Sequence, residues 1–142
     1  MRSLFVVFVS MFSLPLSSYS QAGNDPEQVI RRMIETEALD GHDSKVVGPM
    51  GDAAAVVITK VLADKKLGAG DIDSVLWILG QAFADPSMVH NVSDREPRTA
   101  LLLLRYFDFS TGDPELKGRI AATRKYIEDH YANAMRKAAP AQ

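Results

Sequence analysis

Apolar residues recur at helical spacing in five segments of the chain. In residues 52–67 adjacent apolar pairs repeat four positions apart, a period that gathers them on one side of a helix. Related patterns occupy residues 26–38, 71–84, 94–107 and 113–137. The sequence therefore predicts an all-α fold of about five helices packed as antiparallel pairs, with residues 39–51 as a long loop between the first two.

Capping residues indicate where these helices begin. An aspartate followed by proline and glutamate occurs at Asp25 and again at Asp113, where the carboxylate can cap the helix and the proline suits its first turn. The caps expected for the other helices are Asp52, Asp71, and either Ser93 or Asp94.

Two of the helices carry apolar residues over more than one face. The third, residues 71–84, is apolar around more than half of its circumference, so it is expected to be the most enclosed element. The fourth contains the run Leu101–Leu104 followed by Tyr106 and Phe107. A segment of about ten residues is too short to span a membrane, so the pattern favours a buried helix.

The amino terminus has the pattern of a secretory signal peptide. Arg2 precedes a short apolar run, Leu4–Phe12, and serine-rich chain follows it. We expect cleavage after Ser20 or Ala22, which removes residues 1–20 or a little more and leaves residues 21–142 as a single helical domain without an integral membrane span. The alternative is an uncleaved amino-terminal anchor. Export implies the periplasm in a Gram-negative bacterium and secretion elsewhere.

Composition excludes several classes of function. The chain has 46% hydrophobic and 24% charged residues, as globular domains do, and its net charge of −2 gives no electrostatic footprint for nucleic acid. It contains no cysteine. Disulfides, thiol nucleophiles, thiolate metal sites and lipoprotein attachment are therefore excluded.

Local motifs for catalysis or cofactor binding are missing from the sequence. There is no nucleophile elbow, phosphate loop or dinucleotide fingerprint, and His42, His90 and His130 are not spaced as helical metal ligands. Residues 40–43 combine carboxylates with an imidazole, but a solvated turn is the simpler interpretation. We expect no catalytic residue, metal or cofactor.

A weak internal repeat relates two halves of the domain. Aligning residues 60–62 with residues 105–107 gives an offset of 45 residues, and each copy then contains two apolar helices joined by a glycine-containing turn. Residues 48–56, a proline turn before an alanine-rich helix, resemble the start of a HEAT-like helix. Residues 48–131 thus resemble HEAT-like or armadillo-type helical repeats. The resemblance implies a fragment of an α–α superhelix, or a small bundle, that acts as an interaction scaffold, and it transfers no functional residue.

Two surfaces are candidate partner-binding sites. Asp73, Trp77 and Gln81 recur every four residues, and a tryptophan among polar groups is typical of an interface anchor. Arg98 and Arg105 lie two turns apart on the next predicted helix and can form forked hydrogen bonds with an acidic partner. The alternatives are a Trp77 that packs under the loop or on the last helix, and arginines on a solvated face.

These observations favour an exported protein-binding module without a catalytic role. In the bacterial periplasm it would be an inhibitor or immunity-type protein with a protein partner. The alternatives are a cell-wall glycan enzyme that uses dispersed carboxylates, with Asp73, Asp94 and Glu96 as candidates, or a structural subunit of an envelope assembly.

Overall fold

The computed structural model describes residues 25–140, and this part of the chain is helical without any strand, which confirms the predicted all-α class. The α-helices are α2 (Pro26–Thr36), α3 (Ser44–Val47), α4 (Asp52–Ala63), α5 (Ala69–Ala82), α6 (Arg98–Ser110) and α7 (Pro114–Ala138). Two 3-10 turns, η1 (Pro86–Met88) and η2 (Val92–Arg95), connect α5 to α6. The predicted leader, residues 1–20, lies outside the described residues.

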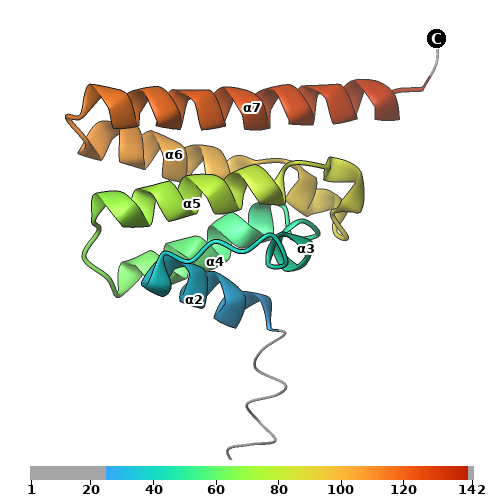
Figure 1. Cartoon of the computed structure of the whole chain (residues 1–142). Helices are drawn as coiled ribbons and strands as arrows, with labels where there is room; N and C mark the ends of the chain where they lie inside the picture. Colours follow the sequence, from blue (N-terminus) through green and yellow to red (C-terminus); the bar gives the residue numbers. More distant parts are fainter. Residues whose placement is uncertain (1–24, 141–142) are drawn as a thin grey trace, which may run out of the picture.

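The helices stack as two pairs with α2 packed at one end (Figure 1). Within the stack α4 contacts α5 and α6 contacts α7, while α4 also packs on α6 and α5 on α7. The first helices of the two pairs begin at residues 52 and 98 and the second helices at 69 and 114, close to the 45-residue offset of the sequence repeat. The pairs therefore form two layers, α4 with α6 and α5 with α7.

Helix α5 is the most enclosed element, as predicted. It contacts α2, α3, α4 and α7, and most of its residues are buried, among them Val75, Ile78 and Leu79 without exposed surface. Burial of such side chains, at about 25 cal/mol per Å² of apolar surface, is the main force that holds the layers together.

The predicted loop 39–51 is shorter than expected because α3 interrupts it. Val47 of α3 is fully buried in the core, and α3 packs on α2 and α5. Just before α3, the buried Asp43 accepts a hydrogen bond from Arg32 of α2, with Nη2 and Oδ1 2.6 Å apart. This ion pair and Val47 together fix the segment against α2.

Asp52 was expected to cap its own helix, and this prediction is wrong. The cap of α4 is Gly51, whose φ of 55° lies in the left-handed region. The carboxylate of Asp52 instead accepts hydrogen bonds from the backbone N–H groups of Thr99 (3.0 Å) and Ala100 (2.9 Å) at the start of α6. Because the residue before α6 is Pro97, which has no capping side chain, Asp52 supplies the missing acceptor from the neighbouring helix.

Asp71 was expected to cap its helix, and this prediction is also wrong. Helix α5 begins at Ala69, and its N-cap is Gly68. The Asp71 carboxylate accepts a hydrogen bond from the backbone N–H of Gly68 (2.7 Å) and pairs with the ammonium of Lys65 (2.6 Å). Burial raises the pKa of Asp71, but the hydrogen bonds from Lys65 and Gly68 and the Lys65 charge outweigh it, so the pKa lies below its ordinary value. The start of α5 is therefore stabilised by a buried carboxylate.

The remaining start signals divide into confirmed and wrong predictions. Asp25 and Asp113 cap α2 and α7 by accepting hydrogen bonds from backbone N–H groups two residues on. Ser93 and Asp94, however, lie in η2, and α6 begins only at Arg98. The proline at position 97 explains the delay, because it disfavours helical geometry in the residue before it.

Candidate partner-binding face

One side of α6 exposes large apolar side chains to solvent. Leu102 is 66% exposed, Tyr106 58% and Phe109 87%, and these residues follow one another at helical steps of four and three. The opposite side of the helix is buried through Ala100, Leu103, Leu104 and Phe107. The prediction of a buried fourth helix is therefore wrong, because α6 is covered on one side only.

Both predicted arginines lie on this exposed side. At 100° per residue, Arg98 and Arg105 fall within the same arc as Leu102 and Phe109, opposite the core. Arg98 forms an ion pair with Glu96 (Nη2 to Oε2, 2.8 Å), and the hydrogen bond with Glu96 raises the pKa of the guanidinium. Arg105 is exposed and forms no ion pair with another described residue.

We call this surface the α6 face and define it by the residues Arg98, Leu102, Arg105, Tyr106 and Phe109. Single exposed apolar residues are ordinary on protein surfaces, but three large ones along one helix face form a patch of the kind found at interaction sites. Tyrosine, phenylalanine and arginine are also the side chains enriched in interfaces. The face therefore has the composition of a docking surface.

The other predicted surface lies in the other layer of the fold. Asp73 of α5 is exposed and forms an ion pair with Arg119 of α7 (3.0 Å). Trp77 is partly buried and packs against the core, and Gln81 is also partly buried. The structure thus brings Arg98 and Arg105 together on one face and keeps Asp73, Trp77 and Gln81 on another.

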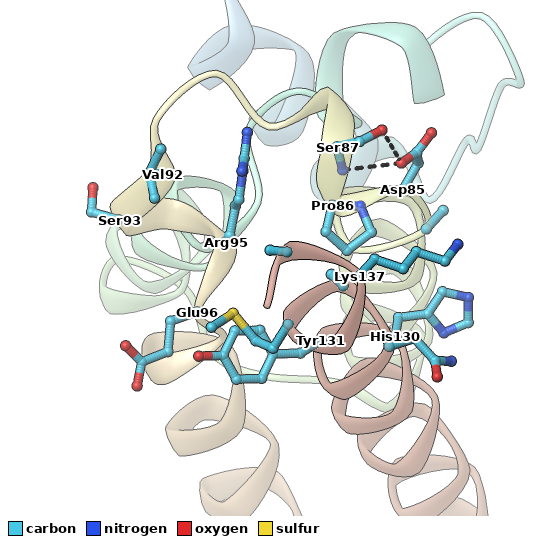
Figure 2. Close-up of a pocket in the computed structure, with 15 residues that line it drawn as sticks. Asp85, Pro86, Ser87, Val92, Ser93, Arg95, Glu96, His130, Tyr131 and Lys137 are labelled. Atoms are coloured by element: carbon cyan, nitrogen blue, oxygen red, sulfur yellow. Dashed lines mark hydrogen bonds between the residues drawn. The ribbon is translucent and has the colours of Figure 1, made fainter. Parts of the chain in front are cut away.

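A groove of about 940 Å³ runs between the carboxyl-terminal part of α7 and the segment that holds η1 and η2 (Figure 2). In Figure 2, Val92 and Arg95 lie on one side of it, Asp85 and Pro86 on the other, and Tyr131 of α7 at one end. Glu96, which pairs with Arg98, also lines it. The groove therefore adjoins the beginning of the α6 face.

The carboxylates considered for glycan chemistry are spread over the molecule and already have partners. Asp73 pairs with Arg119 near the start of α7, while Glu96 lies by the groove near the end of that helix. Asp94 accepts a hydrogen bond from the side-chain amide of Asn91 (3.1 Å). Asp73 therefore lies toward the opposite end of α7 from the other two acids.

Among residues 25–140 no cluster of three or more histidine and acidic side chains is arranged to hold a metal ion. At the turn of residues 40–43, Asp43 forms an ion pair with Arg32, and the Asp40 carboxylate accepts a hydrogen bond from the backbone N–H of His42. In the same part of the chain, none of the helices combines the length and the apolar character that crossing a bilayer requires.

Comparison with known proteins matched no family model, no curated protein and no solved structure.

The sequence pattern placed Leu102 and Tyr106 on a buried helix and did not single out Phe109, so it did not predict the exposed apolar stripe of the α6 face. Leu102, Tyr106 and Phe109 recur at helical spacing, and so does the buried set that begins at Ala100. Two interleaved apolar stripes of one helix look like a single buried helix in the sequence. The arginines at positions 98 and 105 were the only signal that marked the outer stripe.

Proposed function

We propose that this protein is an exported protein-binding module whose α6 face docks on an acidic partner protein. The observation that carries the proposal is the exposed stripe of Leu102, Tyr106 and Phe109 beside Arg98 and Arg105. Apolar anchors at such spacing are the pattern by which a helix enters a hydrophobic groove, and guanidinium groups beside them select a carboxylate.

Charge favours a different protein as the partner over a second copy of this chain. Two α6 faces packed on each other would bring Arg105 of each copy into one interface, and Arg105 has no ion-pair partner among the described residues. Burying like charges together is unfavourable, whereas a partner with one or two carboxylates compensates them. Arg98 already shows this preference within the chain, because it binds the carboxylate of Glu96.

The proposal includes export, with a cleaved leader, and in a Gram-negative cell an inhibitor or immunity-type role in the periplasm. The stacked helix pairs support the proposed resemblance to HEAT-like repeats, which act as scaffolds for binding. Amino-terminal sequencing of protein recovered from the cell envelope tests the export step. The expected result is a chain that begins at Gln21 or Gly23, and a chain recovered intact from the cytosol contradicts export.

A pull-down with matched variants tests the binding step. The full-length gene, with a carboxy-terminal tag, is expressed in the source organism, and the processed protein is recovered from envelope extract. We expect one co-purifying protein in stoichiometric amount, lost in Phe109→Ser and Arg105→Glu. Met135→Ser, which alters a 52%-exposed apolar residue on α7, and Arg124→Glu are the controls and keep the partner. Equal retention by all four variants contradicts the proposal, as does self-association or binding to lipid vesicles through Phe109.

A further inference from the structure

Helix α4 carries an exposed stripe of its own beside the α6 face. The stripe consists of Val56, which is 42% exposed, and of the exposed Thr59, Lys60 and Ala63. At 100° per residue these positions fall within one arc of about 100°. The buried Ile58 and Val61 lie on the opposite side of the helix. We call the four exposed residues the α4 stripe.

The α4 stripe and the α6 face lie at the same register. Asp52 joins the starts of the two helices, because its carboxylate accepts hydrogen bonds from the backbone N–H groups of Thr99 and Ala100. From there α4 and α6 run in the same direction (Figure 1). Their first residues are 52 and 98, so equivalent positions are 46 residues apart. At this offset the α4 stripe corresponds, residue by residue, to Leu102, Arg105, Tyr106 and Phe109.

The two exposed stripes therefore form one surface. The buried residues correspond at the same offset, Ile58 to Leu104 and Val61 to Phe107. Neighbouring parallel helices that bury equivalent sides also expose equivalent sides in the same direction. The outside of the α4–α6 layer is thus a continuous surface made of the α4 stripe and the α6 face, and we call it the α4–α6 surface.

Positive charge on this surface has no partner within the described chain. Neither Lys60 nor Arg105 forms an ion pair with another residue of that part. Packed helices lie about 8–10 Å apart, so one carboxylate placed between α4 and α6 can contact both cations. Nearby acids do not take this place, because Asp108 pairs with Lys117 (3.5 Å) and Asp64 lies beyond the last residue of α4. The surface therefore favours a partner that supplies its own carboxylate.

The arrangement of the layer favours a helix as the docking segment. On its inner side the layer already packs on helices, since α4 contacts α5 and α6 contacts α7. On its outer side Leu102 and Phe109 are exposed beside the smaller Val56 and Ala63, so an apolar helix face gains contacts with both helices. A peptide that binds by strand addition needs a free sheet edge, and residues 25–140 contain no strand.

We propose that the partner protein docks through an acidic amphipathic helix that lies along the α4–α6 surface, with a carboxylate between Lys60 and Arg105 and apolar residues on Leu102 and Phe109. The inference rests on the proposed function and deepens it, because it names the segment of the partner and adds α4 to the site. A partner held by the α6 face alone would overturn this inference and leave the proposed function intact.

Charge variants of α4 test the position of the carboxylate. The partner recovered by the tagged, processed protein from envelope extract is quantified over a dilution series. Lys60→Glu is expected to weaken capture about 5- to 20-fold, and Lys60→Arg, which keeps the charge, less than about twofold. Lys45→Glu, the same change at an exposed lysine of α3, is the matched control and is also expected to stay within about twofold.

The outcome separates this inference from the proposed function. Lys60 is exposed, so its variants are expected to fold, and circular dichroism of each variant checks this. Equal capture by Lys60→Glu and Lys45→Glu contradicts the proposed carboxylate contact. If Phe109→Ser alone loses the partner, docking on the α6 face stands without α4.

Cross-linking from both helices tests the docking helix itself. Benzoylphenylalanine is placed at position 63 or 109, which are equivalent in α4 and α6, or at position 45 on α3 as the control. Positions 63 and 109 are expected to cross-link one protein within a single segment of about 11–18 residues, in which acidic and apolar residues recur three and four apart. Position 45 is expected to give no cross-link, and mass spectrometry of the cross-linked peptides locates the segment. A cross-link from position 109 alone, or to two separate segments, contradicts this inference, and no cross-link from either helix contradicts the proposed function as well.

Discussion

The face of α5 around Trp77 and the α6 face both combine aromatic and charged residues, but the first is covered by other helices and the second is exposed. On α5 the aromatic side chain packs against the core, and the neighbouring Asp73 is neutralised by Arg119 of α7. On α6 the aromatic Phe109 is almost fully exposed, and Arg105 is left without an ion pair among the described residues. A surface whose contacts are already made within the chain stabilises the fold, whereas one whose contacts remain open is available to a partner.

The difference follows from the position of each helix in the stack. Helix α5 is enclosed by α2, α3, α4 and α7, so even its less apolar side meets a neighbour. Helix α6 packs on α4 and α7 and turns the opposite side away from both. Aromatic residues beside charges therefore mark a binding site only where no other helix covers them.

Trp77→Ala is expected to have the largest effect on stability. Loss of a fully buried tryptophan costs about 3–5 kcal/mol, and because Trp77 is partly exposed we expect a loss of about 2–3 kcal/mol in the free energy of unfolding. Urea denaturation followed by circular dichroism measures it. Partner binding per folded molecule is expected to stay unchanged. A loss below about 0.5 kcal/mol together with lost binding would move the docking site from α6 to α5.

Asp52→Ala is expected to cost about 2 kcal/mol, because it leaves the N–H groups of Thr99 and Ala100 unsatisfied at the start of α6. The same denaturation experiment measures it. Asp113→Ala, at the exposed cap of α7, is the matched control and is expected to cost about 1 kcal/mol or less. If the two variants lose equal stability, the Asp52 cap supplied by α4 contributes no more to the free energy of unfolding than an ordinary exposed cap.

The pH dependence of stability is expected to reveal the buried Asp71 at the start of α5. Its pKa is lowered in the folded chain, so its contribution is present above the ordinary value of 3.8 and is lost as the pH falls through the folded pKa. Asp71→Asn is expected to remove the loss of stability that protonation of Asp71 causes at low pH. The midpoints of urea unfolding between pH 7 and pH 2 measure this loss. Asp64→Asn, an exposed carboxylate near the end of α4, serves as the control. Parallel pH profiles for wild type and Asp71→Asn would contradict the account.

Leu102→Ser and Phe109→Ser are expected to have the smallest effects on stability, within about 0.5 kcal/mol, because both side chains are exposed. Their effect falls on binding, where each is expected to weaken partner capture at least 10-fold, as for interface anchors. Thermal denaturation and the pull-down measure the two quantities. A loss above about 2 kcal/mol would show that the α6 face is covered in solution.

Sequence reasoning predicts the fold more fully than the site. The helical class, the enclosed α5 and the caps Asp25 and Asp113 follow from local signals, since spacing and capping act within one helix. Asp52 could not be assigned from sequence, because a carboxylate at a helix start can cap its own helix or a neighbour 47 residues away. The outer stripe of α6 was hidden for a similar reason, since spacing groups residues on a helix without showing which side the rest of the fold covers.

Cross-linking in living cells from a photoreactive side chain tests directly whether the α6 face docks on a partner protein. Benzoylphenylalanine is placed at position 109 on the α6 face or at position 77 on α5, and the tagged protein is recovered after irradiation. We expect a single cross-linked protein partner from position 109 and none from position 77. A cross-link from position 77 alone, or from neither position, would contradict docking through this face.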